Sequence, residues 1–202
     1  MPFNVSTFAA EGLPYGGARA SLFEVFLALP AGIAEPNAEY QFRFVCKAAS
    51  IPASTLGTVE VPYFGRKIKM AGNRTFDNWT VTIMNDEDFL VRNAFEKWSS
   101  FINSHKNNLR DASAIFENGL GAYRTEATVR HYAKTGVFAG GTSAGDAAIS
   151  TREYKFRNIF PVSVSNIDLA WETTDAIEEF TVEFAYDYWT VDVDVSGRVI
   201  TT

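Results

Sequence analysis

The chain has 202 residues, of which 47% are hydrophobic and 21% are charged, values typical of a folded domain with one sizeable core. Its formal net charge of −6 argues against a protein that grips nucleic acid phosphates, because such binding needs a basic surface. The single cysteine, Cys46, excludes an intramolecular disulfide and favours a reducing compartment.

The N-terminal quarter of the chain predicts an arm followed by two strands. Residues 1–20 are rich in Gly and Ala and lack periodicity, so we expect an extended arm. Residues 22–29 and 40–46 both alternate between apolar and polar positions, which predicts two strands joined by the turn-forming residues 31–37. Because a free cysteine in such a run is usually packed in the core, we expect Cys46 to be buried.

Residues 58–74 contain the one basic cluster of this acidic chain. Pro62 indicates an edge strand or a bulge, and Gly65 and Gly72 indicate turns. We expect a hairpin that meets an acidic surface of a neighbouring copy, because complementary charges select partner and register. A solvated turn and a nucleic-acid contact remain the alternatives. The cations of the cluster are Arg66, Lys67, Lys69 and Arg74.

An alternating segment at 79–84 predicts a strand, and the residues after it predict a helix with 3.6-residue periodicity. Asn85 would be the N-cap, and Asp86, Glu87 and Asp88 would occupy the first turn, where the helix dipole favours each negative charge by roughly 0.3–1 kcal/mol. A metal site would need oxygen ligands that converge from several points, so we favour capping. The apolar helix face comprises Val91, Ala94, Phe95, Trp98, Phe101 and Ile102.

The second half of the chain predicts further strands separated by polar loops. Pro161 marks a break between two of them. Residues 136–150 are expected to form a flexible hairpin loop, and residues 190–202 a tail with a short strand. The expected strands are 123–133, 152–164, 166–172 and 178–189. Many short strands and one dominant helix predict a single domain, 1–202: a mainly antiparallel β-sandwich or barrel with one flanking α-helix.

No catalytic or metal-binding pattern stands out along the chain. His105 lies in a polar segment and His131 in an expected strand, and neither has a Cys or second His at metal-ligand spacing. Residues 140–146 lack the lysine of a phosphate-binding loop. We therefore expect an assembly subunit without catalytic residues, cofactor or metal. A triad assembled from distant positions, a carbohydrate-binding or hydrolase module and a nucleic-acid-binding barrel remain open.

Three stretches resemble the tail tube proteins of contractile-tailed bacteriophages. They are FVCKAASIP (44–52), GRKIKMAGNRTFDNWTVTIMNDE (65–87) and AYDYW (185–189). The middle stretch is the most specific, and the resemblance spans about residues 22–189. The arm, the 136–150 loop and the 190–202 tail depart from the family pattern and are candidates for extra contacts between rings.

The resemblance implies a structural virion protein. Six copies would form a ring, each contributing strands to one continuous inner β-barrel, and rings would stack into a tube that conducts DNA on ejection. Implied partners are other copies, the tail sheath protein, the baseplate hub, the tape-measure protein and DNA that passes without specific binding. No membrane partner is implied, and assembly would occur in the host bacterial cytoplasm.

Two further expectations accompany this resemblance. The same fold also builds tubes of phage-derived injection particles and of type VI secretion, which is the alternative function. From the net charge we hypothesise an acidic channel wall that repels phosphate. We expect subunit-interface residues at Arg66, Lys67, Lys69, Asn73, Arg74, Asp187, Tyr188 and Trp189.

Overall fold

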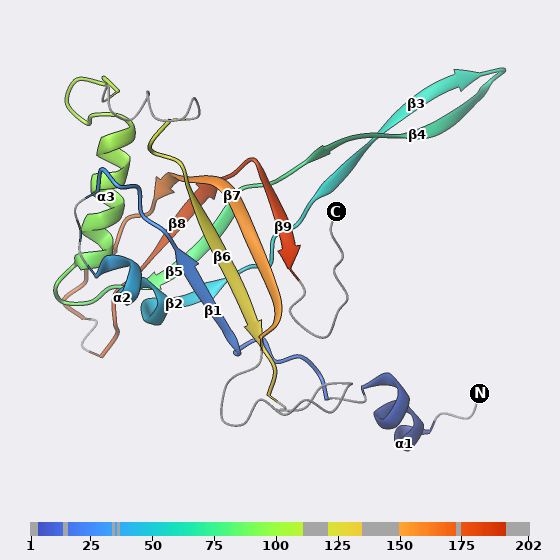
Figure 1. Ribbon diagram of the computed structural model, residues 1–202, viewed down its shortest axis with the longest axis horizontal. Coiled ribbons are helices and arrows are strands. Elements are labelled where there is room, and N and C mark those ends of the chain that lie inside the picture. Colours follow the sequence, from blue (N-terminus) through green and yellow to red (C-terminus); the bar gives the residue numbers. More distant parts are fainter. Residues whose placement is uncertain are drawn as a thin grey trace.

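Two antiparallel β-sheets pack around one core, with the two longest helices at one end and a long hairpin at the other (Figure 1). The computed structural model describes residues 4–13, 16–33, 35, 37–110, 121–134, 150–172 and 175–192. The first sheet holds β1 (Phe23–Leu27), β6 (Thr125–Tyr132), the first part of β7 (Ser150–Val164) and β9 (Tyr188–Asp192). The second holds the last part of β7, β8 (Glu179–Ala185), β5 (Trp79–Met84) and β2 (Cys46–Ala49). The mainly antiparallel β fold is therefore confirmed.

Strand β7 belongs to both sheets because it bends. Its residues up to Ile159 pair with β6, and its residues from Phe160 onward pair with β8. At the bend Asn158 has a φ of 58°, and the register shifts between Pro161 and Ser163. Bulges of this kind let one strand turn a corner between sheets. The expected break at Pro161 is wrong: the proline lies at a bulge inside one continuous strand.

The core between the sheets is rich in aromatic rings. Trp79 stacks on Phe156 with centroids 4.4 Å apart, and Phe95 of the long helix contacts Phe184 edge-on at 5.8 Å. All four side chains are buried. The alternating pattern of residues 79–84 is confirmed, because Trp79, Val81 and Ile83 point into this core.

Helix α3 (Leu90–Ile102) confirms the expected helix but not its start. Val91, Ala94, Phe95 and Trp98 are buried, as the periodicity predicts. The helix begins after the three acids instead of with them, because Phe89 has a left-handed backbone with a φ of 53°.

The hydrogen bonds of the acidic turn before α3 differ from the capping bonds that the sequence predicts. The side-chain amide of Asn85 (Nδ2) donates to Glu178 Oε2 at 3.0 Å instead of capping the helix. Asp88 Oδ1 accepts from the Leu90 amide at 3.0 Å, so one of the three acids does satisfy a backbone donor at the helix start. The expected capping by Asn85, with Asp86, Glu87 and Asp88 in the first helical turn, is therefore wrong in position.

Residues 40–46, expected as a strand, belong to helix α2 (Ala38–Val45). Ala38 and Phe42 are buried four residues apart on one side, and the Phe42 ring contacts Phe95 of α3 at 5.9 Å. Tyr40 and Phe44 lie on the exposed side, in edge-to-face contact at 5.0 Å. The alternating pattern therefore gave a wrong prediction here, because the apolar residues of this segment lie on two different faces of a helix. The expected pairing with residues 22–29 does not form, and β1 pairs with β6.

Two further strand expectations are corrected. Residues 166–172 form no strand. The expected strand 178–189 is two strands, β8 and β9, separated at Tyr186 and Asp187. Strand β9 begins at Tyr188, within the expected strand 178–189, and extends into the predicted tail as far as Asp192.

The terminal segments and the long loop are only partly described. Within the predicted arm, α1 (Val5–Thr7) and a π-helical turn (Phe8–Gly12) are exposed. The expected loop 136–150 lies outside the described residues except for Ser150, and so does the tail beyond residue 192. The roles of these three segments remain predictions.

Cys46 and His131 take the structural roles expected of them. Burial raises the pKa of the Cys46 thiol to about 12. The His131 Nδ1 lies 2.9 Å from Thr151 Oγ1, and its Nε2 lies 2.9 Å from the Arg19 carbonyl. His131 thus fastens the end of the arm to β6.

Candidate assembly surfaces

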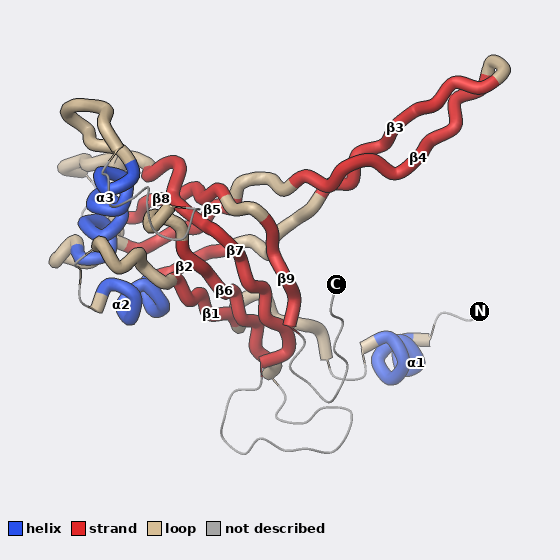
Figure 2. The backbone as a smooth tube through the Cα atoms, turned by 45° about the horizontal axis from the view of Figure 1, so that its top comes forward, coloured by secondary structure: helices blue, strands red, loops and turns tan. Residues whose placement is uncertain are grey.

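The expected basic hairpin is present and projects far from the body of the protein (Figures 1 and 2). It consists of β3 (Thr55–Tyr63) and β4 (Arg66–Thr75), and nearly every residue in it is exposed. Phe64 and Gly65, with φ values of 44° and 78°, form the tip, so the turn expected at Gly65 is confirmed. Gly72 is not a turn: it lies within β4, where a Cβ would come within 3.1 Å of the Gly57 backbone.

The hairpin has two chemically different faces. The cross-strand pairs Val59–Met70 and Val61–Ile68 share one face with Tyr63. Their side chains are between 41% and 63% exposed. The opposite face carries charge. Its members are Glu60, Lys67 and Lys69, with Lys67 Nζ 2.8 Å from Glu60 Oε2.

The exposed apolar face of the hairpin indicates a surface that binds a partner. A two-stranded hairpin is marginally stable by itself in water, and contiguous exposed apolar residues mark interaction sites. The projecting hairpin is therefore the leading candidate surface of the chain.

The hairpin root is fastened to the body by side chains that the sequence singled out separately. The indole N–H of Trp189 donates to the backbone carbonyl of Ala53, with a nitrogen–oxygen distance of 3.4 Å. Arg74 donates to Ser54 Oγ at 2.8 Å. Arg74 and Trp189 thus meet the same short segment before β3. Arg66, Lys67 and Lys69 lie further along β4, toward the tip.

Asp187 belongs to an intramolecular network at the bend of β7. Its carboxylate accepts from Arg124 at 3.1 Å and from the Asn158 amide at 2.7 Å. The neighbouring Tyr188 begins β9 and is 46% exposed. Asp187 therefore has a structural role in the subunit itself. Interface roles for the eight candidate residues remain predictions.

The outer face of the first sheet carries a network of charges around Phe26. The Phe26 ring lies between the guanidinium groups of Arg43, at 4.4 Å, and Arg130, at 4.8 Å. Arg43 donates to Glu24 Oε1, and the Tyr132 hydroxyl donates to Glu24 Oε2 at 2.6 Å. Burial alone would raise the pKa of Glu24, but these bonds outweigh it and hold the pKa below its ordinary value.

A second exposed surface lies in the segment between β7 and β8. Here Leu169 is 78% exposed, Trp171 fully exposed and Ile177 67% exposed. Sequence reasoning missed this surface because it assigned residues 166–172 to a strand. A signal was available: residues 158–192 contain no Lys or Arg.

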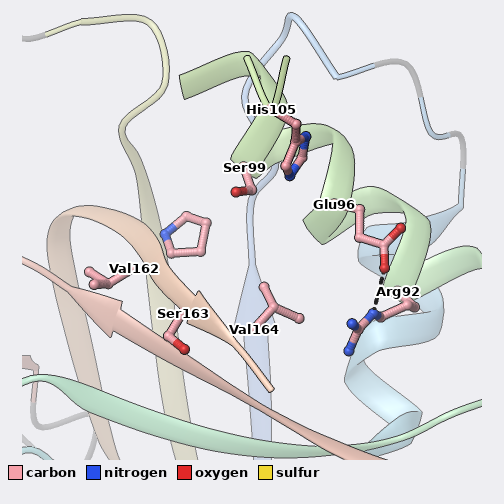
Figure 3. Close-up of a pocket in the computed structure, with 8 residues that line it drawn as sticks. Arg92, Glu96, Ser99, His105, Val162, Ser163 and Val164 are labelled. Atoms are coloured by element: carbon pink, nitrogen blue, oxygen red, sulfur yellow. Dashed lines mark hydrogen bonds and ion pairs between the residues drawn. The ribbon is translucent and has the colours of Figure 1, made fainter. Parts of the chain in front are cut away.

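A groove of about 270 Å³ runs between α3 and the end of β7 (Figure 3). Arg92, Glu96 and Ser99 of the helix and the adjoining His105 face the β7 residues 161–164. Arg92 Nε donates to Glu96 at 2.8 Å, and no hydrogen bond joins His105 to either serine of the groove among the described residues. The groove therefore lacks a nucleophile–base contact.

The described part of the chain contains neither a metal centre nor a membrane-spanning helix. No group of three or more His, Cys, Asp or Glu side chains is arranged to hold a metal ion. No described helix is both long enough and apolar enough to cross a membrane.

The antiparallel β-sandwich and the projecting hairpin with its exposed apolar face are features typical of a structural subunit that binds a protein partner. Comparison with known proteins identifies the subunit more closely. The sequence model of the family "Phage tail tube protein" matches residues 18–192. Tail tube protein gp19 of Enterobacteria phage T4 is 34% identical over 148 residues, which cover 73% of this chain and 80% of that protein. The tail tube protein of Serratia phage KSP90 is 24% identical over 85% of this chain and 86% of that protein.

The chain belongs to the phage tail tube protein family. It is a tail tube protein of contractile-tailed phages, a structural component of the phage tail, as the resemblance in the sequence indicated. Two of the solved structures that share its fold serve as examples. One is a chain of the anti-feeding prophage baseplate, with a TM-score of 0.56, 10% identity and coverage of 88% of this chain and 97% of that one. The other is a chain of the anti-feeding prophage cap, with a TM-score of 0.55, 16% identity and coverage of 88% and 91%.

Proposed function

We propose that this protein forms the inner tube of a contractile phage tail by stacking hexameric rings, and that the β3–β4 hairpin joins its copies. The observation that carries the proposal is the exposed apolar face of the hairpin in a member of the tail tube family. Burial of that face between copies would supply the stability that a lone two-stranded hairpin lacks.

The open ends of the strand order support closure between copies. In the described residues the order runs from β1 at one end to β2 at the other, so the combined sheet does not close within one subunit. Edge strands invite pairing with another chain. A ring of six copies would use such edges to build one continuous barrel around the channel.

We assign the channel wall to the outer face of the second sheet. The residues that alternate with the buried ones on β5 and β8 are mainly Thr and Glu: Thr80, Thr82, Thr181 and Glu183. A wall of this composition would repel phosphate and let DNA pass without specific binding. A tube structure whose channel face is mainly Lys and Arg would overturn this assignment.

The remaining partners follow from the position of a tube within a tail. They are the tail sheath protein, the baseplate hub and the tape-measure protein, and assembly would take place in the host bacterial cytoplasm. A tube of a phage-derived injection particle or of type VI secretion is the alternative, supported by the shared fold with chains of the anti-feeding prophage. The greater identity to a phage tail tube protein favours the phage tail.

Electron microscopy of the purified protein across a concentration series tests the proposal. We expect hollow tubes or six-fold rings, with rings at low concentration and tubes at high concentration or after addition of a baseplate as a nucleus. A protein that stays monomeric at every concentration, with and without baseplates, would refute the proposal.

A further inference from the structure

We propose that the hairpin of one copy docks on the segment between β7 and β8 of a copy in the next ring. This docking segment comprises the described residues 165–172 and 175–178, together with the first residue of β8, Glu179. The inference rests on the proposed tube and names the surface that receives the hairpin.

The first argument is placement. Arg92 of α3 donates to the backbone carbonyl of Ser165 at 2.6 Å. The backbone N–H of Asn85 donates to the backbone carbonyl of Glu178 at 2.8 Å. These bonds hold the docking segment at the α3 end of the body, whereas the hairpin projects from the opposite end (Figures 1 and 2). A protrusion and its receptor at opposite ends make a head-to-tail contact, which generates an open stack of subunits.

The second argument is apolar complementarity. Leu169, Trp171 and Ile177 expose their side chains to solvent in the isolated subunit. Tryptophan is enriched at protein–protein interfaces, so an exposed Trp171 indicates a binding surface. On the hairpin, Phe64 is 90% exposed at the tip and Tyr63 is 63% exposed. Both surfaces therefore offer aromatic side chains that the subunit itself does not cover.

The third argument is charge. The hairpin, residues 55–75, has four basic residues and one acidic residue, a net charge of +3, so the rest of the chain carries −9. Residues 165–179 contain five acidic residues and no Lys or Arg, a net charge of −5. Among the described residues, no basic side chain pairs with Asp168, Glu172 or Asp175. Opposite charges of this size steer association and fix its orientation.

The strongest competing receptor is the exposed side of α2. Tyr40 and Phe44 are 63% and 62% exposed there. Arg43 lies between them on this helix, with its guanidinium 6.0 Å from each ring centroid. Because Glu24 already pairs with Arg43, this patch offers no net negative charge to a basic hairpin, so charge favours the docking segment over α2.

Cysteine cross-linking between two variants tests the contact directly. Cys46 is the only natural cysteine and is buried, so Phe64→Cys and Trp171→Cys each introduce the one accessible thiol of their chain. Both positions are exposed, and circular dichroism would verify that each variant is folded. We expect tubes grown from an equal mixture to yield disulfide-linked dimers on mild oxidation, at several times the yield from either variant alone. Dimers formed equally well by Phe64→Cys alone would overturn the inference.

Charge reversal gives an independent readout. Arg66→Glu and Glu172→Lys should each raise the protein concentration needed for tube growth by about tenfold, and the two combined in one chain should restore it to within about threefold of the natural protein. Asp77→Lys, the same charge change in the exposed segment between β4 and β5, is the control and should leave the concentration unchanged, because no described basic side chain pairs with Asp77. If Glu172→Lys behaves like this control while the natural protein forms tubes, the docking segment is wrong and the tube stands. If the natural protein forms neither rings nor tubes, the proposed function itself fails.

Discussion

The apolar face of the hairpin gives the sharpest prediction, because it separates assembly from folding. Val61 and Ile68 oppose each other on β3 and β4 and are 41% and 50% exposed. Replacing both by threonine keeps β-branched side chains in the strands. The double variant Val61→Thr, Ile68→Thr should therefore leave the isolated subunit folded but weaken the contact between copies.

The size of the effect follows from the exposed fractions. Full burial of a Val or Ile side chain is worth about 1.5–3 kcal/mol, and about half of each side chain remains to be buried, so the pair contributes about 2 kcal/mol to one contact. That is about a 30-fold loss in affinity for each contact. In the proposed ring of six the contacts of all copies would weaken together, so we expect rings without tubes at concentrations where the natural protein forms tubes.

Sedimentation and electron microscopy would measure tube formation, and thermal unfolding would measure stability. Ala71→Thr places a hydroxyl on the opposite face of β4 and is the matched control, with tube formation expected as in the natural protein. Surface changes of this kind usually alter stability by less than about 0.5 kcal/mol. Tubes formed by the double variant at the natural concentration would refute the argument that this face is buried between copies.

Three further predictions concern the subunit itself. Cys46 should resist a thiol reagent at pH 8 in the folded protein and react within seconds after unfolding, because burial raises its pKa to about 12; rapid native reaction would contradict its burial. Glu24 has a lowered pKa, so its stabilising effect is present above the ordinary value of 4.5 and is lost as the pH falls through the lower folded value. Glu24→Gln should thus be less stable than the natural protein at pH 7, with a difference that narrows in acid; a constant difference would contradict this. Asp88→Ala removes the acceptor of the Leu90 amide and should cost about 1 kcal/mol in urea unfolding, whereas Asp88→Asn should retain most of the stability.

The sequence predicts strands well where one face of the strand enters the core and the other does not. Residues 79–83 and 180–184 alternate, and the structure buries the apolar member of each pair of neighbours. Prediction fails at α2, whose eight residues bury Ala38 and Phe42 but leave Tyr40 and Phe44 exposed. Over so short a segment, periods of 2 and 3.6 fit the same apolar positions, and contacts with distant elements, such as that of Phe42 with Phe95, decide between them.

The sequence predicts a candidate surface when the residues that form it are close together in the chain, but not when the surface depends on contacts between distant residues. The basic hairpin was found because its proline, its turn glycine and its cations lie within one stretch of sequence. The link from Trp189 to Ala53 joins residues 136 positions apart, which no local pattern reveals. The docking segment also escaped prediction, because its placement at the end opposite the hairpin depends on the bend of β7 at Asn158.

The apolar residues that the monomer leaves exposed have one explanation in common. Val61 and Ile68 alternate as strand residues do, yet no second layer of the subunit covers them, and Trp171 lies in a segment whose alternation predicts a strand that does not form. Apolar patterning without burial is costly for a subunit that acts alone, since exposed apolar patches promote association. In a tube every subunit has copies at both ends, so a pattern that the monomer leaves uncovered can be completed by its neighbours. In the tube that we propose, the hairpin and the docking segment form the two halves of a second hydrophobic layer between rings.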